Sequence, residues 1–206
     1  MGHVATVVAM DVQGAFDAIL ARRLLQRLRA QGWGIQTMKM IQSFLNDRSI
    51  KARLDGEYTR MLPVKCSTPQ GSPWSPILYI LYLAELLQQQ PQLRFGYADD
   101  VLLTRINTRG NLQQNAEDIA QDIRDVLAWG EENKIFFAAD KTETQHFSRK
   151  KNQDNLDIKV STTLTIEPVQ PPAASQNRVS RSPAIQCTLR WLGVWFDQSL
   201  TFKRHI

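Results

Sequence analysis

The stretch Val4-Ala5-Thr6-Val7-Val8-Ala9-Met10, followed directly by Asp11, decides the fold of this chain. The run is apolar or β-branched and carries no charge, which predicts a strand buried on both faces of a sheet. Asp11 ends the run, so its carboxylate is expected at the end of a central strand. An acid at this place is either a cap for the helix that follows or part of a site.

Two helices and a hairpin are predicted after this strand. Gly14 breaks the strand pattern, and apolar residues at helical spacing predict helices over Ala15–Ala30 and Ile35–Leu45. Asp55-Gly56 lies between two extended runs, which is typical of a β-hairpin. The loop Ser67–Pro73 is rich in turn residues, and Ser75-Pro76 opens a third helix in the order of cap and then proline.

The rest of the chain alternates strands with one long helix. A tight hairpin with Asp99-Asp100 at its tip is predicted from two short apolar runs. The predicted elements are a helix to about Gln90, strands Leu93–Ala98 and Val101–Thr104, a helix Asn111–Asn133, and strands Thr142–Phe147 and Leu189–Phe196. This order indicates an α+β fold, with an antiparallel sheet packed on helices. Residues 1–206 are expected to form one partial domain, with the polar, proline-containing segment 150–187 as a flexible insert.

Composition excludes several classes of protein. The 206 residues are 43% hydrophobic and 22% charged, which is a normal globular balance. The net charge of +5 agrees with a phosphate-bearing partner but does not establish one. Cys66 and Cys187 lie far apart and form no CxxC motif, so neither a disulfide framework nor a zinc site is supported. No apolar run is long enough to cross a membrane, so we expect no membrane partner and an intracellular protein.

Three acids lie where an apolar core would not favour them, namely Asp11, Asp99 and Asp100. Two carboxylates about 4 Å apart repel each other by roughly 4 kcal/mol at an effective dielectric constant near 20. A hard divalent cation such as Mg²⁺ would compensate this repulsion, and two ions can act on an attacking hydroxyl and a leaving phosphate oxygen. The alternative is a solvated turn, because aspartate favours turns.

The motifs around these acids resemble those of a known family. Five stretches, in family order, are similar to motifs A to E of the reverse transcriptases, in the form found in non-LTR retrotransposons. They are Val8–Asp17, Thr68–Pro76, Phe95–Asp100 with its YADD box, Phe136–Glu143 and Leu189–Val194. The resemblance covers nearly the whole chain and implies a polymerase palm, with fingers and thumb largely absent.

The resemblance implies a metal site. Asp11 and Asp99 would ligate two Mg²⁺ ions, Mn²⁺ being an alternative, with Asp100 as a weaker partner and the Val12 carbonyl completing the coordination. Lys141 would protonate the leaving pyrophosphate as a general acid. Its alternative interpretation is a solvated surface lysine.

The resemblance also implies contacts to nucleotide and primer. Phe16 would exclude the 2′-hydroxyl of a ribonucleotide by overlap, and its alternative is a core residue at a helix start. Gln70 and Gly71 would contact the incoming nucleotide and the template, where glycine allows close approach of the backbone. Their alternative is a stiff helix entry. The last predicted set, Trp191, Leu192 and Gly193, would hold the primer end, and these residues also suit an apolar strand that packs on the palm.

The implied activity is addition of deoxynucleotides to a DNA primer on an RNA template, and an intact parent protein would act in the nucleus. An inactive remnant of a retroelement, which at most binds nucleic acid, is the second hypothesis. A metal-dependent sugar transferase or nucleotide cyclase with a related acid pair is a third, although it leaves Pro69-Gln70-Gly71 unexplained. Oligomeric state does not follow from the sequence.

Overall fold

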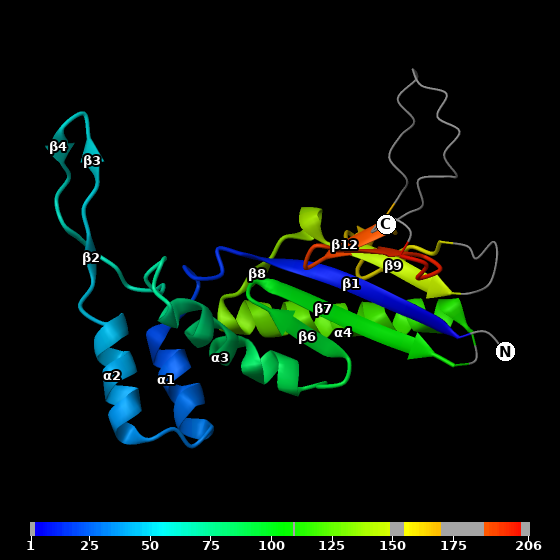
Figure 1. Cartoon of the computed structure of the whole chain (residues 1–206), viewed down its shortest axis with the longest axis horizontal. Coiled ribbons are helices and arrows are strands. Elements are labelled where there is room, and N and C mark those ends of the chain that lie inside the picture. Colours follow the sequence, from blue (N-terminus) through cyan, green and yellow to red (C-terminus); the bar gives the residue numbers. More distant parts are fainter. Residues whose placement is uncertain (1–2, 109, 149–154, 170–187, 203–206) are drawn as a thin grey trace.

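The computed structural model describes residues 3–108, 110–148, 155–169 and 188–202, and its central element is the strand β1 (Val4–Gln13). β1 lies within a five-stranded sheet, between β7 (Asp100–Asn107) on one side and β9 (Glu143–Ser148) on the other. β6 (Arg94–Tyr97) pairs with the outer edge of β7, and β8 (Phe136–Phe137) pairs with the end of β1. All these pairs are antiparallel, as predicted (Figure 1).

The two faces of β1 are covered differently. Every second residue from Val4 to Val12 is buried, whereas the residues between them, from Ala5 to Asp11, are half-buried. The prediction of burial on both faces is therefore wrong for the second face. The long helix α4 (Leu112–Asn133) packs on the first face only (Figure 1). Asp11 belongs to the less covered face, which leaves its carboxylate accessible.

α4 begins and packs as its sequence predicts. The Asn111 side chain accepts a hydrogen bond from the Gln114 N–H at 3.1 Å, which caps the first turn. Such a cap contributes about 1 kcal/mol. Apolar residues at helical spacing then face the sheet, and each fully buried aliphatic side chain stabilises the fold by about 1.5–3 kcal/mol. They are Ile119, Ile123 and Val126, all at 0% exposure.

Close contact at the end of α4 depends on Gly130. A Cβ atom at this position would lie 2.5 Å from the Ile135 carbonyl oxygen and 3.2 Å from the Phe137 ring. The Ile135 N–H donates to the Gly130 carbonyl at 2.9 Å. The chain that leads into β8 therefore passes directly over the helix at a place where only glycine fits.

An extended ribbon separates the first two helices from the third. α1 (Ala21–Ala30) and α2 (Ile35–Leu45) precede it, and α3 (Trp74–Gln88) follows it. α2 has its predicted range. α1 starts later than the predicted Ala15, because residues 14–20 form turns in which the Asp17 and Ala18 N–H groups donate to the Gly14 carbonyl. No helix within the described ranges is both long and apolar enough to cross a membrane.

Arg27 connects three of the helices. Its guanidinium lies 4.3 Å from the ring centroid of Tyr82 on α3 and 5.1 Å from that of Trp129 on α4. It also donates to the Tyr82 carbonyl at 2.6 Å and to the Asn133 side chain at 2.7 Å. These contacts fix α1 and α3 beside the helix that supports the sheet.

The hairpin predicted around Asp55-Gly56 is confirmed as a long ribbon between α2 and α3 (Figure 1). Its four short strands are β2 (Ser49–Ile50), β3 (Arg53–Leu54), β4 (Glu57–Tyr58) and β5 (Leu62–Pro63).

The predicted insert 150–187 is folded over residues 155–169. Here β10 (Ile158–Lys159) and β11 (Thr165–Ile166) pair and pack on α4, with Ile158 and Ile166 in the core. The other residues of the insert, including Cys187, lie outside the described ranges, whereas Cys66 is an exposed free thiol. The predicted strand Leu189–Phe196 is instead a hairpin, β12 (Thr188–Trp191) and β13 (Val194–Asp197).

A buried polar network joins β1, β9 and α4. The Asn115 amide donates to the Thr6 hydroxyl oxygen at 2.7 Å, and that hydroxyl lies 2.8 Å from His146 Nδ1. His146 Nε2 donates to the Leu156 carbonyl at 2.7 Å, because a carbonyl oxygen can only accept, so in the neutral ring Nδ1 accepts from the Thr6 hydroxyl. A neutral imidazole fits this arrangement. Burial lowers the pKa of His146, which favours the neutral form.

The stability of the fold should therefore decrease in mild acid. The folded state disfavours protonation of His146, while the unfolded chain takes up that proton below a pH of about 6.5. The free energy of unfolding should be constant above this pH and fall below it, by at most about 1.4 kcal/mol per pH unit from this one group. Thermal unfolding from pH 7.5 to 5.5 would measure the effect.

His146→Gln should be less stable at pH 7.5 and should lose this part of the pH dependence. His3→Gln is the matched control, since His3 is exposed at the start of β1. Equal slopes in wild type and His146→Gln would contradict the assignment.

Candidate active site

Antiparallel pairing of β1 with β7 brings the three predicted acids to one end of the sheet. In this register Asp11 is directly opposite Asp100. The Val12 N–H donates to the Asp99 carbonyl at 3.2 Å, so the residue after Asp11 also contacts the residue before Asp100. Residues almost ninety positions apart in the sequence are thus neighbours, as the motif resemblance implies.

A tight turn between β6 and β7 carries Asp99. Tyr97 pairs with Asp100, which leaves Ala98 and Asp99 as the turn residues. Ala98 has a φ of +51°, a left-handed conformation that is unfavourable for a residue with a Cβ atom. The turn leaves the Asp99 side chain exposed and that of Asp100 half-buried. The pairing of β7 with β1 and with β6 therefore holds Asp99 and Asp100 at this end of the sheet.

Electrostatic repulsion is visible in the acid and phenol groups of the site. The pKa of Asp100 is raised by burial and then by the charges of Asp99 and Asp11. The pKa of Tyr79 on α3 is raised by burial and by the same two aspartates. Its buried hydroxyl has no hydrogen-bond partner among the described residues. Burial is the larger cause of both shifts, and the carboxylates of Asp11 and Asp99 add to it, so the site favours cations.

Lys141 forms an ion pair with one of these carboxylates. Lys141 Nζ lies 2.8 Å from Asp11 Oδ2, and this hydrogen bond together with the Asp11 charge raises the pKa of Lys141. The short helix η1 (Ala139–Lys141) presents the lysine, and it is held in place because the Ala138 N–H donates to the Asp11 carbonyl at 2.9 Å. The predicted general acid is therefore in contact with a predicted metal ligand.

The donor set fits a hard divalent cation in its chemistry. The oxygens at the end of β1 and in the β6–β7 turn are carboxylates, the ligands that Mg²⁺ prefers. Over the part of the chain that the structure describes, however, no three His, Cys, Asp or Glu side chains are close enough together to hold a metal ion. Asp11 points to Lys141 instead, so ligation by all three acids requires that side chain to turn.

Phe16 lies beside the loop that the motifs place at the nucleotide. Its half-buried ring meets the Tyr79 ring edge-on, with 5.7 Å between centroids. The Thr68 N–H donates to the Phe16 carbonyl at 2.8 Å, which joins the segment after β1 to the Pro-Gln-Gly loop. Gln70 and Gly71 in that loop are exposed, and Gly71 has a φ of +85°.

Arg48 is a residue that the sequence analysis missed. Its guanidinium donates to the Ser67 carbonyl at 2.7 Å and to the Ser67 hydroxyl at 2.8 Å. Ser67 has a φ of +90°, so these bonds hold a strained residue at the start of the Pro-Gln-Gly loop. Nothing in the local sequence distinguishes Arg48 from the other arginines. Tyr79 was missed too, because it has the helical spacing of a core residue.

The predicted primer grip is the turn of the β12–β13 hairpin. Leu192 and Gly193 have φ angles of +49° and +80°, which suit a two-residue hairpin turn. Trp191 lines an apolar cavity of about 380 Å³ together with Phe95 on β6 and Leu102 on β7. The hairpin thus packs beside the strands that carry Asp99 and Asp100, and both predicted interpretations of these residues, grip and packing, remain compatible.

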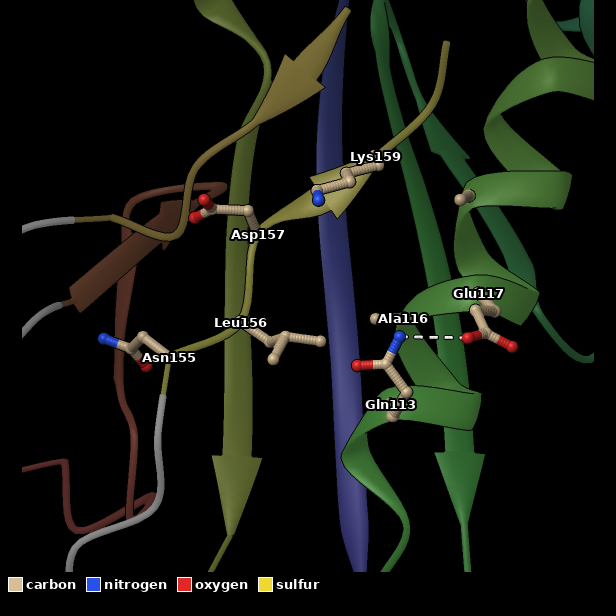
Figure 2. Close-up of a pocket in the computed structure, with 8 residues that line it drawn as sticks. Gln113, Ala116, Glu117, Asn155, Leu156, Asp157 and Lys159 are labelled. Atoms are coloured by element: carbon tan, nitrogen blue, oxygen red, sulfur yellow. Dashed lines mark hydrogen bonds between the residues drawn. The ribbon is translucent and has the colours of Figure 1, made fainter. Parts of the chain in front are cut away.

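A larger and more polar hollow contains none of the predicted site residues. Figure 2 shows this cavity of about 480 Å³ between α4 and the segment that leads into β10, with Asp157 and Lys159 on one side and Gln113 and Glu117 on the other. Gln113 donates to Glu117 across one turn of α4 at 2.9 Å. The acids of the sheet end, and not this hollow, carry the chemistry that the sequence predicts.

Comparisons with known proteins identify the family of this chain. The model of the family described as reverse transcriptase (RNA-dependent DNA polymerase) matches residues 1–196. The chain is 24% identical over 206 residues to the RNA-directed DNA polymerase from mobile element jockey of Drosophila melanogaster, covering 96% of this chain and 20% of that protein. It is 26% identical over 208 residues to the probable RNA-directed DNA polymerase from transposon X-element of the same species, again covering 96% and 20%.

Solved structures show the same fold. Apo telomerase from Candida tropicalis superposes with a TM-score of 0.56 at 11% identity, covering 97% of this chain and 32% of that one. Telomerase from the same species in complex with a fragment of telomeric RNA gives 0.53 at 13% identity, covering 74% and 27%. These likenesses confirm the palm-like fold.

The chain spans about a fifth of the length of the polymerases that it matches. The predicted resemblance to the polymerases of non-LTR retrotransposons is confirmed by these relatives. With the family model matching residues 1–196, this chain belongs to the reverse transcriptase (RNA-dependent DNA polymerase) family.

Proposed function

We propose that this chain is the catalytic palm of an RNA-directed DNA polymerase from a non-LTR retrotransposon. In this proposal it adds deoxynucleotides to the 3′-hydroxyl of a DNA primer paired with an RNA template. The observation that supports it best is the strand register that sets Asp11 opposite Asp100 and next to the turn with Asp99. An intact parent protein would work in the nucleus, where its target DNA lies.

Asp11, Asp99, Asp100 and the Val12 carbonyl would hold two Mg²⁺ or Mn²⁺ ions. Bound at these oxygens, such ions would activate the primer hydroxyl and stabilise the charge on the leaving phosphate. The rigid sheet holds Asp11 and Asp100 at paired positions, and the tight turn limits the freedom of Asp99. Burial, and after it the charges of Asp99 and Asp11, raise the pKa of Asp100, and a cation bound at these oxygens would offset that effect.

The remaining residues would position the substrates. Lys141 Nζ carries a proton at the rim and would donate it to the leaving pyrophosphate. Phe16 would occupy the space of a ribose 2′-hydroxyl, and Gln70 and Gly71 would contact the nucleotide and the template. The Trp191–Gly193 turn would hold the primer end.

Primer extension tests the proposal directly. With Mg²⁺ and dTTP, the chain should extend oligo(dT) on poly(rA), and it should not add dTTP to oligo(dT) without a template. Failure to extend with either Mg²⁺ or Mn²⁺, by protein whose folding is verified by circular dichroism, would contradict the proposal for this chain.

One observation favours the second candidate, an inactive chain that at most binds nucleic acid. In the described ranges the acids do not form a ready three-ligand metal site, and Lys141 is paired with Asp11. If this pair persists in the presence of metal, extension will be absent while binding of RNA remains.

Lys141 should therefore have two separable effects. Replacement by methionine removes the cation that competes for Asp11, so Mg²⁺ should bind about two- to fivefold more tightly in titration calorimetry. The same change removes the proposed proton donor and should lower the rate of extension by about 100-fold or more.

Asp11→Asn is the opposite case, because it removes a ligand and should weaken Mg²⁺ binding. Lys134→Met is the matched control, since Lys134 is an exposed lysine at the end of α4. Unchanged Mg²⁺ affinity and unchanged extension in Lys141→Met would show that this lysine is only a solvated surface residue.

A further inference from the structure

An exposed ribbon stands away from the helices at the end of the molecule opposite the N-terminus (Figure 1). We call residues 49–63 the arm. Each of its residues is exposed, and no described helix covers either of its faces. An isolated two-stranded ribbon buries little surface of its own and is marginally stable, so an arm of this length suits a contact with a partner.

The arm has two chemically distinct faces because of its register. Ser49 and Ile50 pair with Pro63 and Leu62 at the base, whereas Arg53 pairs with Tyr58 near the tip. The extra residue of the second strand, at Arg60 and Met61, forms a bulge between the two pairings. Alternation then places apolar side chains on one face, namely Ile50, Leu54 and Leu62.

The other face gathers positive charge around an aromatic ring. Lys51 Nζ lies 4.4 Å from the centroid of the Tyr58 ring, and the Arg53 guanidinium carbon lies 5.6 Å from it. A third cation, Arg60, follows two residues after Tyr58 on the second strand, at the bulge. Tyr58 is 59% exposed in spite of these cations. The acids of the arm lie elsewhere, Asp55 at the tip and Glu57 opposite Leu54 on the apolar side.

We propose that this face of the arm binds single-stranded nucleic acid, and that its ligand is the unpaired template strand ahead of the active site; the template assignment rests on the proposed function. Three cations at the spacing of a β-ribbon match a phosphate backbone, and an exposed aromatic ring between them offers a platform for an unpaired base. Stacking requires an unpaired base, which favours a single strand over a duplex.

The base of the arm is bonded to the active site. The Val64 N–H donates to the Arg48 carbonyl at 2.8 Å, and Arg48 in turn holds both oxygens of Ser67. Ser67 N–H donates to the Ile19 carbonyl at 3.0 Å, close to Phe16. A strand held by the arm is therefore linked through one arginine to the loop that carries Gln70 and Gly71.

Fluorescence anisotropy with 5′-labelled oligo(U) RNA tests the proposal. The measurement is made on the full chain in EDTA, so that it is independent of metal and catalysis. A triple variant, Lys51→Gln, Arg53→Gln and Arg60→Gln, removes the basic face. Its matched control removes the same charge from α1 and α2, at the exposed residues Arg22, Lys39 and Arg29.

The triple variant should bind RNA about 100-fold more weakly at 0.1 M salt, with a log–log salt slope smaller by about 2, because each contact to single-stranded phosphate contributes about 0.7 to that slope. Tyr58→Ala should weaken binding about 10-fold without changing the slope, and Tyr58→Phe should restore it. The control triple should bind more tightly than the arm triple.

Equal losses in both triple variants would overturn the proposal, since they would show a general charge effect. Loss of binding to phosphatidylserine vesicles, with RNA binding unchanged, would overturn it in favour of a lipid surface. Primer extension separates the two proposals. If the wild type extends primers but the arm variants bind RNA normally, the proposal for the arm is wrong and the proposed polymerase function stands. If RNA binding depends on the arm but no primer is extended, the proposed polymerase function is wrong and RNA binding by the arm stands.

Discussion

Asp99→Asn should lower the rate of primer extension by at least about 1000-fold, the loss expected when several kcal/mol of stabilisation by a bound metal disappear. The substitution keeps the shape of the side chain and removes one negative charge. It should not disturb the fold, because the contact of this residue to β1 is made by its main-chain oxygen, which accepts from Val12. Asp11→Asn should have a similar effect on extension.

Asp157→Asn is the matched control for Asp99→Asn. Asp157 is an exposed acid that lines the hollow beside α4 (Figure 2). The carbonyl of its neighbour Leu156 accepts a hydrogen bond from His146. His146 is paired with Thr6 on β1. Asp157 therefore lies well before Asp11 along the strand. Single-turnover extension measures both variants under one condition. Activity in Asp99→Asn equal to that of the control would show that the carboxylates of the β6–β7 turn take no part in catalysis.

Phe16→Ala should raise the use of ribonucleotides relative to deoxynucleotides by about 100-fold. A pocket that rejects a group by overlap loses this discrimination when the overlapping side chain is removed, and steric differences of this size are worth one to two orders of magnitude. The ring is half-buried and is supported edge-on by Tyr79, so it is held firmly and still has an open side. The measurement is the ratio of kcat/KM for dGTP and GTP on one RNA template.

The competing interpretation of Phe16 as a core residue predicts a different result. In that case Phe16→Ala would lower the Tm and leave the ratio of dGTP to GTP use unchanged. Phe44→Ala provides the comparison, because Phe44 on α2 is also a half-buried phenylalanine packed against the core. It should lower stability with no change in sugar discrimination.

The central strand and its acids could be predicted because their signals are local. An uncharged run ending in Asp11 and a short hairpin with Asp99-Asp100 at its tip each define an element within ten residues or so. The range of α2 and the cap at Asn111 also follow from local patterns. Pairing of Asp11 with Asp100 depended on the resemblance to a family, since no local pattern fixes which strands meet.

The errors occurred where distant hydrogen bonds override local preference. Residues 15–20 have helical spacing, yet the carbonyls of Phe16 and Ile19 accept from Thr68 and Ser67. A helix there would use those carbonyls internally. β10 and β11 could not be predicted in this polar segment because the strands are very short, and only the tertiary structure shows that Ile158 and Ile166 belong to the core. The Arg48 contact to Ser67 has no sequence signal either.

The close passage of the chain over Gly130 couples the candidate active site to a position that carries no chemistry of its own. Any side chain at this position would push away the segment from Ile135 to Ala138, and Ala138 is the residue that fixes the Asp11 main chain. Under the proposed polymerase function, a substitution at Gly130 would therefore abolish primer extension in a chain whose acids are all intact. Intact aspartates alone would therefore not be sufficient evidence that a related sequence encodes a working polymerase.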